Sequence, residues 1–195
     1  DDLTAGYEAT RHLIDLGHTR IACIAGCAFE YHSAWQRQLG YQKALAEASL
    51  TPREEFFDCT FYAMEEGYQL FKKMRNLPEP PTAFITYSDQ LAIGVIRAAA
   101  DMGLTVPGDI SVVGFDDIEL ASFVTPRLTT IYQDKALIGE TAVKLILKRL
   151  EDPARPGKPA AFTLVTRGPN RYGQTVRTER WRYTRCSDGT AELYD

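Results

Sequence analysis

Apolar positions in the first quarter of the chain change their spacing in a regular order. Within Thr4–Leu16 they recur at helical spacing, and Gly17 supplies a stop. Arg20–Ala25 is a short, almost continuous apolar run, which is typical of a strand buried on both faces of a parallel sheet. Ser33 is expected to be the N-cap of a helix that ends near Ala48.

The same alternation continues along the rest of the chain. The expected strands are Phe56–Phe61, Thr82–Thr86, Ile110–Gly114, Leu128–Ile131 and Phe162–Val165. The expected helices are Ala63–Met74, Gln90–Met102, which Asp89 can cap, and Lys135–Leu150. Because helices and strands alternate, the pattern predicts an α/β fold with a parallel, doubly wound sheet and right-handed crossovers.

Ligands of such sheets bind where the strands reach their carboxyl ends. Four loops follow the expected strands at that edge: Gly26–Ser33, Phe61–Met64, Tyr87–Asp89 and Phe115–Asp117. We therefore expect these loops to lie together and to hold any binding site.

The last 26 residues break the pattern. From Asn170 to Asp195 there are five arginines and no lysine, and strand-helix alternation stops. Thr175–Tyr183 alternates like an exposed strand, Ser187–Gly189 is a turn signal, and a short run follows at Ala191–Tyr194. The tail is therefore predicted to form a β-hairpin.

Composition restricts the function classes. The chain is 45% apolar and 25% charged, as in an average soluble globular protein, and its apolar runs are too short to span a membrane. No charged start precedes an apolar stretch, so no signal peptide is expected, and we expect a cytoplasmic location. A net charge of −4 predicts poor nucleic-acid binding by the chain alone. Because the chain starts at Asp1, it is expected to be a piece of a longer protein.

Motifs for catalysis or metal binding are missing from the sequence. There is no G-x-S-x-G, H-E-x-x-H or G-x-x-x-x-G-K-[ST] motif, so no enzyme activity, catalytic residue or cofactor is predicted. The four cysteines lack the spacing of a zinc site or of a disulfide framework: Cys23, Cys27, Cys59 and Cys186.

Polar and aromatic candidates gather at the expected strand ends. Asp116, with Asp117 beside it, can accept hydrogen bonds from ligand hydroxyls or bind a metal, and equally can cap a helix or form a turn. Arg37 is most often a surface residue in such a position, but it can also donate to a ligand. Phe61 or Tyr62 can stack on a sugar or belong to the core edge, and Ser88 can simply cap a helix.

Several long motifs resemble the effector-binding domain of the lactose-repressor (LacI/GalR) family of bacterial transcription regulators. They include Leu16-Gly17-His18, Arg20-Ile21-Ala22, Gly40-Tyr41, Pro81-Thr82-Ala83, Asp89-Gln90 and Ala92-Ile93-Gly94. The longest is Val106-Pro107 with Asp109 to Asp117, and Leu128-Thr129-Thr130-Ile131 with Gln133 completes the set. The resemblance covers residues 1–168. It implies a two-lobed fold of the periplasmic-binding-protein type, of which this chain carries mainly the second lobe, with the hinge and the returning helix and strand.

The resemblance also implies a site. Its effector-facing residues would be Arg37, Phe61, Tyr62, Ser88 and Asp116, with Gln133 and Lys135 near the hinge. Ile93 and Val124 would lie in a homodimer interface. The implied effector is a sugar or a nucleobase, and the carboxylates favour a neutral sugar or glycoside. DNA binding would belong to an N-terminal helix-turn-helix that this chain does not contain.

Two other functions stay open at this point. A solute-binding protein of a sugar transport system has the same fold class. Residues 169–195 form an unrelated tail, in which Arg177–Tyr183 and Glu192–Asp195 resemble a C-terminal segment of type I sulfatases. The sulfatase motif C-x-[PA]-x-R is missing from the sequence, so sulfatase activity is the least favoured of the three.

Overall fold

A computed structural model describes residues 1–26, 32–60, 63–151, 161–166, 172–177, 182–186 and 191–194. The chain divides into two compact units, Asp1–Gln133 and Asp134–Asp195. The predicted domain boundary at residue 168 stays a prediction. Among the described helices, none combines the length and apolar character that a bilayer crossing requires.

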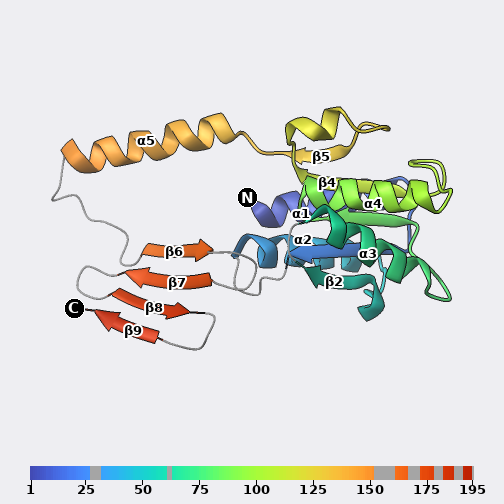
Figure 1. Cartoon of the computed structure of the whole chain (residues 1–195), viewed down its shortest axis with the longest axis horizontal. Coiled ribbons are helices and arrows are strands. Elements are labelled where there is room, and N and C mark those ends of the chain that lie inside the picture. The colour runs from blue at the N-terminus through green and yellow to red at the C-terminus, as the bar shows by residue number, and fades with distance from the viewer. Residues whose placement is uncertain are drawn as a thin grey trace. The chain divides into compact units, whose positions relative to one another are not determined.

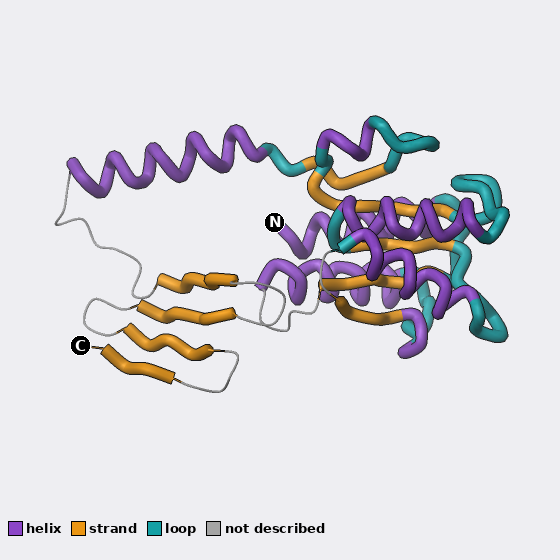
Figure 2. Tube along the Cα trace, viewed as in Figure 1, coloured by secondary structure: helices purple, strands orange, loops and turns teal. Residues whose placement is uncertain are grey.

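The first unit is the predicted α/β domain (Figure 1). Its elements are α1 (Asp2–Asp15), β1 (Ile21–Gly26), α2 (His32–Glu47), β2 (Phe57–Thr60), α3 (Met64–Arg75), β3 (Ala83–Thr86), α4 (Asp89–Asp101), β4 (Ser111–Asp116) and β5 (Thr129–Tyr132), with short 3-10 helices η1 (Glu54–Phe56) and η2 (Glu119–Ser122). The strands are parallel in the order β2-β1-β3-β4-β5. Figure 2 draws the strands in orange and the helices in purple. The doubly wound parallel sheet is therefore confirmed.

Strand residues alternate between two cores, one on each face of the sheet. Ile24 and Phe84 join the side chains of α3 and α4, whereas Cys23 and Ile85 join those of α1 and α2. Because both faces are covered, nearly every position in β1, β3 and β4 is apolar, which is why the sequence shows continuous runs there.

Glycines allow the helices of each layer to touch at the backbone. A Cβ atom at Gly40 of α2 would collide with the carbonyl oxygen of Leu3 in α1, and one at Gly94 of α4 would collide with that of Met64 in α3. Both glycines belong to motifs of the family resemblance, but their packing role depends on a neighbouring helix and was not predicted.

Two predicted helix caps are wrong. α2 begins at His32, so Ser33 lies inside the helix. α4 begins at Asp89 and is capped by Ser88, whose hydroxyl oxygen accepts a hydrogen bond from the Leu91 N–H at 3.3 Å. Both Ser88 and Asp89 are residue types that cap helices well, so the sequence alone does not tell which of them is the N-cap. In the structure the Asp89 carboxylate makes other contacts, described below, and Ser88 is the cap.

The second unit contains α5 (Lys135–Glu151) and a four-stranded antiparallel sheet. The strands are β6 (Ala161–Thr166), β7 (Tyr172–Arg177), β8 (Arg182–Cys186) and β9 (Ala191–Tyr194). Pairing of β8 with β9 confirms the predicted hairpin. The single strand predicted over Thr175–Tyr183 is wrong, because β7 and β8 are separate strands that pair with each other in antiparallel register.

Candidate functional site

The described loops at the carboxyl ends of the strands surround one open pocket of about 510 Å³. Its walls come from the start of α2, the end of β3, the start of α4, the end of β4 and the residue after β5. The lining residues are Ser33, Arg37, Tyr87, Ser88, Asp89, Gln90, Asp116, Ile118 and Gln133. Four predicted site residues from separate segments of the sequence therefore line one pocket at the carboxyl ends of the strands: Arg37, Ser88, Asp116 and Gln133.

Arg37 is buried, with 7% of its surface exposed, so its interpretation as an ordinary surface arginine is wrong. Its Nε donates to Asp2 Oδ1 at 2.8 Å, and its Nη1 donates to the carbonyl oxygen of Tyr87 at 2.8 Å. The guanidinium carbon lies 4.2 Å from the centre of the Phe115 ring. Three contacts of different kinds thus fix the guanidinium at the pocket wall.

Asp116 ends β4 in a strained backbone conformation. Its φ is +101°, and that of Asp117 is +45°, a region that residues other than glycine seldom adopt. Gln133 Nε2 donates to Asp116 Oδ1 at 2.8 Å. Strain of this kind persists where the surrounding structure enforces it, often at functional sites. Asp116 does not cap η2, whose N-cap is Ile118, so the capping interpretation is wrong.

Asp89 lines the pocket. It was predicted as a helix cap in a strand-end loop, but not as a site residue. Its side chain is fully buried. Oδ1 accepts the Thr130 hydroxyl at 2.5 Å and Oδ2 accepts the Ile118 N–H at 2.8 Å. Burial raises the pKa of Asp89, the two hydrogen bonds oppose this effect, and the nearby Asp116 and Asp117 add to it. Asp89 therefore links α4 to β5 across the floor of the site.

Ser33, Tyr87, Gln90 and Ile118 also line the pocket but were not predicted as site residues. Ser33 and Tyr87 lie in the loops that the strand-end rule had singled out, so a signal for them existed. Their role was missed because residue chemistry alone does not tell which loop side chains face inward.

The other predicted site and interface residues stay predictions. Phe61 and Tyr62 lie outside the described residues. Lys135 is the first residue of α5, which belongs to the second unit. Ile93 on α4 and Val124 after η2 are half-buried residues of the first unit. Within the described ranges, no group of three or more His, Cys, Asp or Glu side chains is placed to hold a metal ion.

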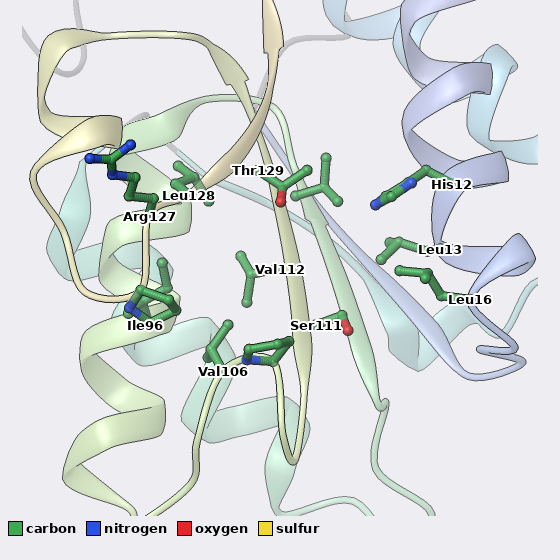
Figure 3. A pocket seen from close by; sticks show the side chains of 13 residues that line it. His12, Leu13, Leu16, Ile96, Val106, Ser111, Val112, Arg127, Leu128 and Thr129 are labelled. Atoms are coloured by element: carbon green, nitrogen blue, oxygen red, sulfur yellow. The ribbon is translucent and has the colours of Figure 1, made fainter.

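A second, smaller pocket of about 120 Å³ lies at the opposite ends of the strands. Figure 3 shows His12 and Leu16 of α1 on one side and Ile96 of α4 with Arg127 on the other. Val106, Val112 and Leu128 make its walls mainly apolar. Among its described lining residues there is no carboxylate and no side-chain amide to converge with Arg127, which makes it the weaker candidate for an effector site.

Comparison with known proteins agrees with this geometry. Residues 10–168 match the family described as a periplasmic binding protein-like domain. The chain is 42% identical over 161 residues to the HTH-type transcriptional repressor PurR of Glaesserella parasuis, covering 80% of this chain and 47% of PurR. It is 40% identical over 153 residues to the ribose operon repressor of Escherichia coli K12, covering 78% of this chain and 46% of that repressor. The chain thus spans about half the length of these relatives.

Solved structures show the same fold. A LacI family transcriptional regulator from Enterococcus faecium, solved with bound ribose, superposes with a TM-score of 0.74 at 29% identity and covers 80% of this chain and 57% of that one. These relatives are transcription regulators and not enzymes. The family match ends at Gly168, and the sulfatase resemblance of the tail has no support from these comparisons. The chain therefore belongs to the periplasmic binding protein-like family, in the form of the small-molecule effector-binding domain of LacI-family transcription regulators.

Proposed function

We propose that the pocket at the strand ends binds a small neutral sugar, and that this binding controls a transcription regulator in the cytoplasm. The observation that carries the proposal is the convergence of Arg37, Asp116 and Gln133 on one cavity of about 510 Å³. That volume lies within the range of roughly 300–1,000 Å³ typical of small-molecule sites. The ribose operon repressor and the ribose-bound regulator support a sugar as the ligand class.

The polar groups of the pocket suit hydroxyls better than an anion. Each sugar hydroxyl needs a donor or acceptor once it is buried. Arg37 supplies guanidinium N–H groups, Asp116 supplies a carboxylate, and Gln133 supplies an amide. Among the described lining residues, one arginine stands against two aspartates, Asp89 and Asp116, so these residues give a carboxylate or phosphate ligand no net attraction.

The test is a titration of the chain with D-ribose, other neutral monosaccharides and a nucleobase, followed by NMR. We expect a sugar to bind with a dissociation constant of about 1 mM, or about −4 kcal/mol, because an open site leaves its hydrogen bonds in competition with water. Asp116→Asn is expected to weaken binding about tenfold, since a hydrogen bond to a charged group contributes roughly 1.5–3 kcal/mol.

Asp117→Asn is the matched control, because Asp117 is the exposed neighbour of Asp116 and does not line the pocket. Asparagine tolerates the positive φ at both positions. Binding of the nucleobase in preference to every sugar would refute the ligand class. Equal effects of the two substitutions would refute the role of Asp116.

The predicted homodimer is also part of this proposal. Ile93 lies on α4, and Val124 follows Phe123, whose side chain is 74% exposed. An exposed aromatic that directly precedes the half-buried Val124 favours contact with a second copy. In sedimentation, we expect weak self-association that Ile93→Asp and Phe123→Asp both reduce. Gln42→Asp, an exposed position on α2 in the other helix layer, is the control. A tight dimer unaffected by either of the first two substitutions would contradict the assignment.

DNA recognition is not expected of this chain alone. With 22 basic against 26 acidic residues, it lacks the excess of positive charge that phosphate binding needs. Sequence-dependent retention of the chain by an operator in a gel shift at moderate salt would refute this expectation.

A further inference from the structure

The arginine of the proposed site is held by a residue that does not line the pocket. Asp2, in the first turn of α1, accepts a hydrogen bond from Arg37 Nε with its Oδ1 at 2.8 Å. The Arg37 side chain is 9% exposed and that of Asp2 is 36% exposed. This ion pair therefore lies at the edge of the protein interior, where solvent screens it less than a surface pair.

Backbone contact between α1 and α2 brings the two side chains together. A Cβ atom at Gly6 would collide with the carbonyl oxygen of Arg37 itself. Asp2 lies one turn before Gly6 on the same face of α1. The close approach that Gly6 permits thus sets Asp2 against Arg37, although 35 positions separate them.

The contacts of Arg37 leave part of its guanidinium for a ligand. Arginine has five N–H donors in a rigid fork. Among the described residues, Asp2 takes the Nε–H and the Tyr87 carbonyl takes one N–H of Nη1. Phe115 supports the flat face of the group. Three N–H donors have no hydrogen-bond partner among the described residues, on a side chain that lines the pocket. Because the guanidinium is rigid, their direction is set once its Nε–H is held.

A purely structural role for Asp2 is the competing explanation. Acidic residues in the first turn of a helix interact favourably with its dipole. Asp1 already performs the capping role here, since its Oδ1 accepts the Leu3 N–H at 3.1 Å and its Oδ2 accepts the Thr4 hydroxyl at 2.9 Å. The Asp2 carboxylate is directed to Arg37, not to the helix end.

We propose that Asp2 is a positioning residue of the effector site, which orients the Arg37 guanidinium toward the ligand. This inference rests on the proposed function in assigning a ligand contact to Arg37. Asp2 itself does not touch the ligand and acts only through Arg37.

The first test needs no ligand. Hydrogen exchange of the Arg37 Nε–H is measured by NMR in the chain, with the resonance identified by its loss in Arg37→Lys. We expect slow exchange in the unsubstituted chain and exchange at least about tenfold faster in Asp2→Ala, because the hydrogen bond that protects this proton is gone. Asp15→Asn is the control: it removes an exposed carboxylate of the same helix, which pairs with Arg11. Unchanged exchange in Asp2→Ala would overturn the inference.

The second test measures the affinity for D-ribose. We expect Asp2→Ala to raise the dissociation constant about tenfold and Asp2→Asn to raise it less, because asparagine keeps an acceptor but loses the charge. Asp109→Asn controls for lost stability, since the Asp109 carboxylate accepts the Thr105 N–H at 2.7 Å in the loop before β4, at the strand ends opposite the pocket.

The two hypotheses fail in different ways. If Arg37→Lys weakens ribose binding and Asp2→Ala does not, the positioning role of Asp2 is wrong while the site stands. If Arg37→Lys has no effect on the binding of any sugar in the titration, or none of these sugars binds, the proposed function fails. The exchange measurement alone then decides whether Asp2 fixes the arginine.

Discussion

The hydrogen bond between Thr130 and Asp89 offers a direct test of how the site is built. Thr130 Oγ1 donates to Asp89 Oδ1 at 2.5 Å, and the Asp89 side chain is fully buried. Thr130→Val keeps the shape of the side chain but removes this donor. Hydrogen bonds to charged groups contribute roughly 1.5–3 kcal/mol, so we expect the free energy of unfolding to fall by about 2 kcal/mol at pH 7. For a unit of this size the melting temperature should fall by about 8 °C.

The loss of unfolding free energy caused by Thr130→Val should be larger at neutral pH than at acidic pH. Burial raises the pKa of Asp89 above its unfolded value, so the native state holds the proton more tightly. Stability from this group is therefore complete below the unfolded pKa and is lost as the pH rises toward the native pKa. Thr130→Val removes the hydrogen bond from Thr130, which lowers the pKa of Asp89 in the native state. Without this bond, more stability is lost at neutral pH. Near pH 4, where more of the carboxyl is protonated, the penalty should shrink to about 1 kcal/mol, the value for a neutral hydrogen bond.

Urea unfolding followed by circular dichroism at pH 4 and pH 7 measures both values. Thr130→Ser keeps the hydroxyl and should lose little stability. Thr129→Val makes the same change at the adjacent, exposed residue of β5 and should have little effect. A Thr130→Val penalty that is as large at pH 4 as at pH 7, or below about 0.5 kcal/mol at both, would refute the reasoning.

Three further predictions concern the packing of the first unit, each with a control substitution or a denatured control. Gly94→Ala forces a Cβ atom against the Met64 carbonyl oxygen and should lower the free energy of unfolding by about 3 kcal/mol. Gly139→Ala, in open space on α5, should instead stabilise its helix by up to about 1 kcal/mol. The two substitutions should shift the thermal unfolding temperature in opposite directions, and shifts of the same sign would contradict this. The Cys23 thiol is fully buried, and burial raises its pKa to about 12, so iodoacetamide at pH 8 should label it at least about 100-fold more slowly in the native chain than in urea. Peptide mass spectrometry checks this, and native labelling at the unfolded rate would disprove it. Tyr41→Phe removes a buried hydrogen bond to the Ile21 carbonyl oxygen at 2.9 Å and should lower the free energy of unfolding by about 1 kcal/mol. Tyr7→Phe should lower it less, because the Tyr7 hydroxyl donates to Glu47 at the surface. Chemical denaturation measures both values, and a larger loss for Tyr7→Phe would be inconsistent with the structure.

Local patterns along the chain were sufficient to predict the architecture of the first unit. The continuous apolar run at Arg20–Ala25 and those of the later strands predicted a sheet covered on both faces. The spacing and length of such apolar runs follow directly from which side chains are buried. The rule for strand ends then placed Ser88 and Asp116 at one edge, since parallel strands end on the same side of a sheet. The long motifs pointed to the family that the comparisons confirm.

Only the tertiary structure decided which polar groups lie inside and what they contact. Arg37 has the pattern of a surface residue, and its burial depends on Asp2, Tyr87 and Phe115, which are far from it in sequence. Hydrophobic periodicity records whether a position faces the core, but it does not record which distant segment supplies a partner. Such partners arise when elements pack, as Gly6 shows by letting the backbones of α1 and α2 touch, and no local pattern encodes that contact.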